Sequence, residues 1–395
     1  MKYNSRWPLF NEDMINDIND VIRSGKVNQW TGNKVFEFQN KFCEYFKCKH
    51  AVAVSNGTVA LDVCLKALNL NQSDEVIVTS RSFIASASCC LFNKIKVNFA
   101  DVDLNSQNIT VESIKNVMNK NVKAIIIVHL AGYAADIENI LNFCNNNNLY
   151  LIEDCAQCHG GKFKDKYLGT FGHINSWSFC QDKIITTLGE GGMITTNNTE
   201  LFKKAWSIKD HGKNYDKVFA NLKYDKIQKN SNKFEYIHDN IGTNWRLTEV
   251  QAVVGIHSLD LLNEWLKIRR RNAQILINKF KLCKLVRIPY IPDYIYHSYY
   301  KFYIFINTEN LKEKSNRDSI LNEIIEYGIP CQQGSCGEIY KENSFKNYKN
   351  IKCPNSIKLS ETAIMFKIDP TYNEIEMEEI ADICITIFNN NIKLP

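Results

Sequence analysis

The stretch KAIIIVHLAGYAADIENILNFCNNNNLYLIED, residues 123–154, carries the pattern on which the fold prediction depends. An Ile- and Val-rich run at 123–130 predicts a strand, residues 137–144 have helical spacing of apolar side chains, and residues 149–153 predict a second strand. A strand, a helix and a strand joined by short connections are typical of a parallel sheet that is covered by helices.

The same alternation precedes this stretch. Predicted strands at 51–54, 75–79 and 96–99 alternate with a predicted helix that ends near residue 68 and with others at 83–92 and 111–118. These strands are nearly continuous apolar runs, as a sheet buried on both faces requires. We therefore predict an α/β fold with a large, mostly parallel sheet. Ligands of such sheets bind beyond the carboxyl ends of the strands, which singles out 56–58, 82–83 and Asp154.

The chain outside this core predicts a second, smaller unit. Helical patterns occur at 11–25 and 35–46, and a long helix begins near residue 247. After that helix the sequence becomes β-rich at 298–306, with helices predicted at 316–327 and 374–388. We predict an amino-terminal arm and large α/β domain over 1–264 and a small α+β domain over 265–395. The polar segment 213–239 is predicted to be a loop.

Composition excludes several classes of protein. The 395 residues include 48 Lys and Arg against 43 Asp and Glu, a net charge of +5 that does not indicate nucleic-acid binding. Nothing approaches the ~20 consecutive apolar residues that a membrane-spanning helix needs. The start of the chain lacks the apolar core of an export signal, so we expect a cytoplasmic protein whose 14 cysteines stay reduced.

Residues 155–159 read Cys155-Ala156-Gln157-Cys158-His159 and carry three alternative interpretations. The spacing matches haem attachment, a redox dithiol, or half of a zinc site with Cys331 and Cys336 as the nearest second pair. Haem attachment requires export, a dithiol belongs in a small thiol-exchange domain, and the second pair has a non-standard spacing. We favour none of the three and expect no metal; Cys155 and Cys158 are predicted to be packing residues.

A different constellation points to cofactor chemistry. A carboxylate at the end of a buried strand, Asp154, needs a cationic partner. Lys183, between hydroxyl and apolar residues and ahead of Gly189-Glu190-Gly191-Gly192, is a candidate for a Schiff base. Gly57 and Thr58 open a predicted helix, whose amino end suits phosphate, and the aromatic Phe83 follows the next strand. Together these features describe a pyridoxal phosphate site.

These motifs resemble the DegT/DnrJ/EryC1/StrS family of sugar aminotransferases, from about residue 24 to about residue 370. The resemblance rests on Ser55-Asn56-Gly57-Thr58, Ser82-Phe83-Ile84-Ala85, Glu153-Asp154-Cys155-Ala156-Gln157, Ser178-Phe179 with Lys183, and Gly242-Thr243-Asn244-Trp245-Arg246. It implies the type I pyridoxal phosphate fold, with a large sheet domain and a small carboxy-terminal domain. Cys180, Gln181 and Asp182 depart from the family pattern.

The resemblance also implies roles for individual residues. Lys183 carries the cofactor and Asp154 pairs with its ring nitrogen, while the other implied cofactor contacts are Asn56, Gly57, Thr58, Phe83, Gln157, Ser178 and Asn244. Asn244 reaches the phosphate of a neighbouring subunit, which makes the expected assembly a homodimer with shared active sites. Implied substrate contacts are Trp30, Thr31, Gln333 and Arg246, where Arg246 holds a donor carboxylate or a substrate phosphate, or forms an interface ion pair.

The implied reaction is transamination. A related branch that removes a sugar hydroxyl has His in place of the lysine, so Lys183 favours amino transfer. The expected donor is an amino acid, glutamate in most relatives, and the expected acceptor is a nucleotide-linked keto sugar for a surface polysaccharide or glycan. Two alternatives stay open: a small keto phosphate (such as dihydroxyacetone phosphate) or free keto sugar as acceptor, and a non-catalytic protein that only binds pyridoxal phosphate.

Overall fold

A computed structural model describes residues 2–224, 236–348 and 350–393 of the chain. Its centre is a seven-stranded sheet in the order β1-β9-β8-β5-β4-β2-β3. The pairings from β8 to β3 are parallel, and β9 runs antiparallel to both of its neighbours. In sheet order the strands are His50–Val54, Gly192–Thr196, Ile174–Ser178, Tyr150–Asp154, Val122–Val128, Glu75–Thr79 and Lys96–Ala100. The predicted α/β class with a large, mostly parallel sheet is confirmed.

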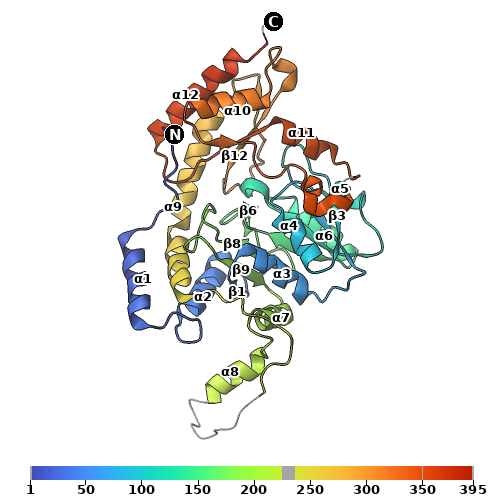
Figure 1. Cartoon of the computed structure of the whole chain (residues 1–395), viewed down its shortest axis with the longest axis vertical. Coiled ribbons are helices and arrows are strands. Elements are labelled where there is room, and N and C mark those ends of the chain that lie inside the picture. The colour runs from blue at the N-terminus through green and yellow to red at the C-terminus, as the bar shows by residue number, and fades with distance from the viewer. Residues whose placement is uncertain (1, 225–235, 349, 394–395) are drawn as a thin grey trace.

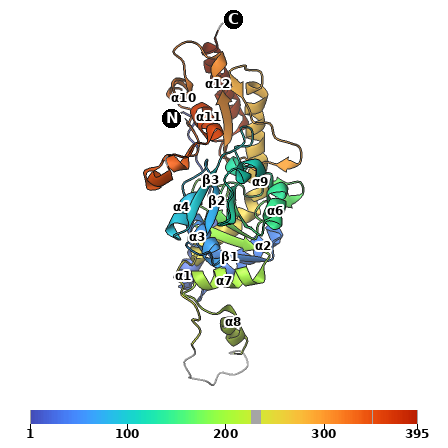
Figure 2. The same ribbon diagram turned by 90° about the vertical axis from the view of Figure 1, so that its right-hand side faces the viewer.

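Helices cover both faces of this sheet, as Figures 1 and 2 show. Alternate side chains of one strand enter different cores: Ile125 and Ile127 of β4 pack in one hydrophobic cluster, Ala124 and Ile126 in another. This explains the unbroken apolar runs in the sequence. The helices of this part of the chain are α1 Glu12–Ser24, α2 Lys34–Phe46, α3 Gly57–Ala67, α4 Ala85–Phe92, α5 Val111–Lys115, α6 Ile137–Asn146 and α7 Thr199–Lys209.

A third core lies around a smaller antiparallel sheet of order β10-β12-β14-β13. These strands are Val286–Arg287, Phe302–Ile306, Ala363–Phe366 and Cys331–Gln332. A three-stranded sheet of β11 Ile295–Tyr296, β6 Lys162–Phe163 and β7 Lys166–Tyr167 lies beside the large one. The helices of the carboxy-terminal part are α10 Arg317–Glu326, α11 Pro354–Thr362 and α12 Glu374–Asn390.

One long helix, α9 (Glu249–Phe280), joins the two parts (Figure 1). Thr248 caps its amino end through a capping box with Gln251. Leu262 and Leu266 of α9 pack in a core of the large sheet, whereas Leu276 and Phe280 pack in the core of the small one. The helix runs through the predicted boundary at 264–265, and the division of the chain there stays a prediction.

The predicted loop at 213–239 is wrong in its first part. Residues Tyr215–Tyr224 form α8, which projects at the bottom of Figure 1. Tyr215 and Phe219, one helical turn apart, pack against each other with ring centroids 4.5 Å apart, and the Tyr215 ring packs on Trp206. These aromatic contacts, within α8 and with α7, stabilise a helix whose polar sequence shows little helical spacing of apolar residues. Residues 225–235 lie outside the described residues.

No helix in the described ranges is long and apolar enough to cross a membrane.

Candidate active site

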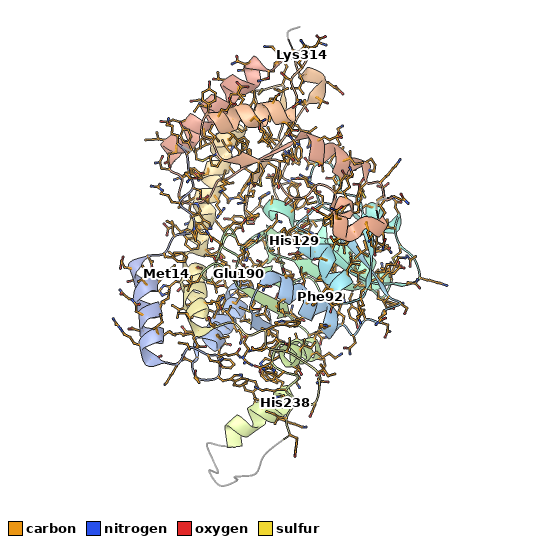
Figure 3. All side chains as sticks on the ribbon, viewed as in Figure 1. Met14, Phe92, His129, Glu190, His238 and Lys314 are labelled. Atoms are coloured by element: carbon orange, nitrogen blue, oxygen red, sulfur yellow. The ribbon has the colours of Figure 1, made fainter. Side chains whose placement is uncertain are left out.

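A pocket of about 770 Å³ lies at the carboxyl ends of β5 and β8 and at the amino end of α3. Glu190 also lines the pocket, and its label in Figure 3 marks the position of the pocket in the middle of the molecule. The pocket collects side chains from segments that are far apart in the sequence. The predicted cofactor residues that line it are Asn56, Gly57, Thr58, Phe83, Asp154, Gln157, Ser178 and Lys183.

The amino end of α3 forms one end of the pocket. Asn56 caps the helix, since its side-chain oxygen accepts a hydrogen bond from the Val59 amide at 2.9 Å. Gly57 lies so close to β8 that a Cβ there would come within 2.5 Å of the Ser178 Cβ. Free backbone N–H groups, a helix dipole and the Ser178 hydroxyl thus meet where no side chain fills the space, an arrangement suited to a phosphate group.

Asp154 ends β5 at the bottom of the pocket and is only 5% exposed. Its carboxylate accepts hydrogen bonds from the Ser86 hydroxyl at 2.7 Å and from the Ala156 amide at 3.1 Å. Burial raises the pKa of this carboxyl, and these two hydrogen bonds and the more distant Lys183 only partly oppose the shift. A cationic group placed against Asp154 in the pocket would reverse that effect.

Lys183 enters the pocket from the loop between β8 and β9. Its ammonium donates a hydrogen bond to the Tyr300 hydroxyl at 3.1 Å and lies 3.5 Å from an oxygen of Asp182. The Tyr300 hydroxyl in turn donates a short hydrogen bond to Asp182. Burial opposes ionisation of Asp182, but Lys183, the Tyr300 hydroxyl and Lys301 outweigh it and lower the pKa of the carboxyl. Asp182, a departure from the family pattern, is therefore part of the environment of Lys183.

Five predicted residues do not line this pocket. Arg246 forms an ion pair with the buried Asp210 at 2.8 Å within the same chain, and Trp30 donates its indole N–H to the same carboxylate. Asn244 is exposed and next to this cluster, since its backbone forms a bridge to Asp210. The exposed Thr31 and Gln333 are also outside the pocket, although Gln332 and Gly334 beside Gln333 line it.

The Cys155-Cys158 motif is completely buried. Both thiols and His129 offer ligand atoms within 4.8 Å of one another. However, His129 Nδ1 accepts a hydrogen bond from the Ala135 amide, and Nε2 is 2.9 Å from the Glu153 carboxylate. Because both ring nitrogens are already engaged, His129 has no free lone pair for a metal ion.

Comparison with known proteins identifies the chain. The sequence profile of the DegT/DnrJ/EryC1/StrS aminotransferase family matches residues 8–388. The chain belongs to this family. As a member of the DegT/DnrJ/EryC1/StrS aminotransferases it is a pyridoxal phosphate-dependent enzyme of fold type I, which confirms the resemblance seen in the sequence.

Three similar proteins illustrate the DegT/DnrJ/EryC1/StrS relationship. An aminotransferase structure from Psychrobacter cryohalolentis has a TM-score of 0.94 and 39% identity, covering 98% of this chain and 99% of that one. A GDP-perosamine synthase of Escherichia coli is 34% identical over 309 residues, 78% of this chain and 79% of its own. A UDP-N-acetyl-3-dehydro-alpha-D-glucosamine 3-aminotransferase of Acidithiobacillus ferrooxidans is 30% identical over 338 residues, 86% and 83% of the two chains.

The pocket of this DegT/DnrJ/EryC1/StrS aminotransferase fits pyridoxal phosphate by its chemistry. The amino end of α3 and Ser178 suit the phosphate. The buried Asp154 lacks an adjacent cation, which a protonated ring nitrogen would supply. Lys183, on the loop that follows β8, provides the amine for a Schiff base. A pocket of about 770 Å³ also leaves room for a substrate beside the cofactor.

Sequence reasoning did not single out Ser86, which lies beside the pocket, or Tyr300, Lys301 and Lys367, which line it. Ser86 follows Ser82 by one helical turn, and the two hydroxyls lie 3.2 Å apart, so the helical spacing from Ser82 was a usable signal. The others come from the carboxy-terminal part of the chain, where no local motif marks them; they are Tyr300, Lys301 and Lys367.

Proposed function

We propose that this aminotransferase moves the amino group of an amino acid, L-glutamate, to the keto group of a nucleotide-linked sugar used for a surface polysaccharide or glycan. The observation that carries the proposal is Lys183 in a pocket of about 770 Å³ that the buried Asp154 and the amino end of α3 also line. The sugar class is supported by the relatives, whose names include a GDP-perosamine synthase and a dTDP-3-amino-3,6-dideoxy-alpha-D-galactopyranose transaminase.

Individual side chains divide the work in this proposal. Pyridoxal phosphate, when bound, supplies an acceptor for the electron pair left at the donor's α-carbon. Asp154 holds the proton on the ring nitrogen, and the α3 amino end with Ser178 holds the phosphate. Lys183 binds the cofactor covalently in the resting enzyme and, once displaced by the donor, moves the α-carbon proton. Phe83 packs on the ring, and Gln157 lies beside it.

The proposal extends to a homodimer with shared active sites. Asn244 is exposed in the single chain and lies outside the pocket, so it is free to reach the pocket of a second copy. In this arrangement Asn244 hydrogen-bonds the phosphate held by the partner. Arg246, Trp30 and Thr31 lie on the same side and contact the substrate there, while Gln333 contacts it from the chain's own carboxy-terminal segment.

The direct test labels the lysine. Borohydride reduction of the purified enzyme followed by peptide mass spectrometry should place the cofactor on Lys183, and Lys183→Ala should hold it only noncovalently. The wild type should convert glutamate to 2-oxoglutarate with nucleotide-linked keto sugars. Label on another lysine would refute the assignment, and turnover only with dihydroxyacetone phosphate or free keto sugars would refute the acceptor class.

A further inference from the structure

A second cavity, of about 110 Å³, adjoins the pocket. Its lining includes Asp182, Tyr300, Lys301 and Lys367, and these four residues also line the large pocket. The two spaces therefore adjoin at these four side chains, and Lys183 donates a hydrogen bond to one of them, Tyr300. A ligand group in the small cavity would lie close to the reacting lysine.

The small cavity is rich in cations that lack full partners. Arg269 is 1% exposed, and its Nε and Nη2 have no hydrogen-bond partner, while Nη1 has only long contacts of 3.3 and 3.5 Å to backbone carbonyls. Its guanidinium lies over the ring of Trp7, with 5.1 Å from Cζ to the ring centroid. Nε and Nη2 form the edge of the guanidinium that binds a carboxylate through two hydrogen bonds.

The two lysines of the cavity have few partners among the described residues. Lys301 has one ion pair, with Asp182 at 3.8 Å, and among the described residues Lys367 has neither a hydrogen bond nor an ion pair. Burial, together with the nearby cations Arg269, Lys367 and Lys183, lowers the pKa of Lys301 to about 8 against the attraction of Asp182. A cluster of cations this close together costs free energy that an anion would recover.

The two carboxylates of the cavity are already engaged. Asp369 accepts hydrogen bonds from the Ser5 and Thr371 hydroxyls, both at 2.6 Å. Asp182 is shared among Tyr300, Lys183 and Lys301. These two carboxylates repel a dianionic phosphate more strongly than a singly charged carboxylate. The small volume and these charges favour one carboxylate group.

We propose that Arg269, Lys301 and Lys367 form a subsite for the side-chain carboxylate of the amino donor. A molecule with its amine at Lys183 in the large pocket and a carboxylate in the small cavity must hold the two groups several bonds apart. A dicarboxylic amino acid meets this requirement, whereas alanine does not. The inference rests on the proposed transaminase function and adds the residues that select the donor.

Calorimetric titration of the cofactor-loaded enzyme with glutarate, a dicarboxylate without an amine, tests the subsite. Lys367→Met should weaken glutarate binding by about tenfold or more, the usual effect of losing one charge-assisted contact, and Lys367→Arg should retain most of it. Lys358→Met, at an exposed lysine of α11, is the matched control and should bind as the wild type does. Acetate and inorganic phosphate are titrated alongside.

Steady-state kinetics adds a second readout. Lys367→Met should raise the KM for glutamate with little change in kcat, and should leave the KM for alanine unaltered. Arg269→Met should behave in the same way if its thermal unfolding is normal. Glutarate binding that is unchanged in Lys367→Met, or phosphate binding without glutarate binding, would overturn the subsite. Loss of covalent cofactor at Lys183 would instead refute the transaminase function, so the two failures are distinguishable.

Discussion

Asp154 shows at the scale of one residue how the protein is built for a ligand. Its carboxyl is buried against Ser86 and the Ala156 amide, without an adjacent cation, and its pKa is raised. A raised pKa in the folded state means that the unfolded chain gives up this proton more readily. The ionised carboxylate therefore costs folding stability, and that cost grows as the pH rises through the two pKa values.

We expect Asp154→Asn to separate stability from function. In the cofactor-free protein at neutral pH the unfolding midpoint should rise or stay equal, because the amide can accept from the Ala156 N–H and donate to the Ser86 hydroxyl without a buried charge. Cofactor affinity should fall by about 10- to 100-fold, since a charged hydrogen bond is lost, and transamination should slow. Thermal scans and equilibrium titration measure both effects. The exposed Asp165→Asn is the control, and a destabilised cofactor-free Asp154→Asn protein would contradict the argument.

Most of the cofactor residues of the pocket could be predicted from the sequence alone. Asp154 ends a strand, and Phe83 and Gly57 each follow one. Because parallel strands end at one edge of a sheet, their proximity was predictable from local patterns. Tyr300 and Lys367 reach the same place from the small sheet. Their position depends on how that sheet packs on the large one, which no spacing in the sequence records.

At the scale of elements, strands and helices of the large sheet were predictable because their apolar residues are nearly continuous or helically spaced. Helix α8 was not, since its stability comes from aromatic packing against Trp206 of α7. The structure also shows a contact that the sequence does not predict. At the start of α3, Gly57 lies closer to Ser178 of β8 than any larger residue could.

Gly57→Ala should therefore damage the phosphate end of the pocket. The added Cβ would lie 2.5 Å from the Ser178 Cβ, so α3 and β8 must move apart. We expect a loss of about 1–3 kcal/mol in the free energy of unfolding, typical of overpacking, together with weaker cofactor binding. Gly25→Ala at the end of α1 is the control: its positive φ of 69° costs ~1 kcal/mol, but cofactor binding should stay normal. Equal cofactor affinity in both variants would contradict the assignment.

At the scale of the whole molecule, the shared active site can be tested by mixing chains. A heterodimer of one Lys183→Ala chain and one Asn244→Asp chain carries both lesions in one site and none in the other, if each site takes Asn244 from its partner. Random mixing of equal amounts should recover about a quarter of wild-type activity. Each variant alone is the control. Demonstrated heterodimers without recovery would place Asn244 at its own chain's cofactor.

The unbroken course of α9 governs how the two parts of the chain can move. Its 32 residues make a rod of about 48 Å that is embedded in one core at Leu262 and in the other at Phe280. Lys183 precedes α9 in the chain, and Tyr300 and Lys367 follow it. The small sheet is held both by this continuous helix and by Tyr303, Phe305 and Met365, which pack in the core of the large sheet. Moving the small sheet relative to Lys183 would therefore require α9 to bend and that shared core to rearrange.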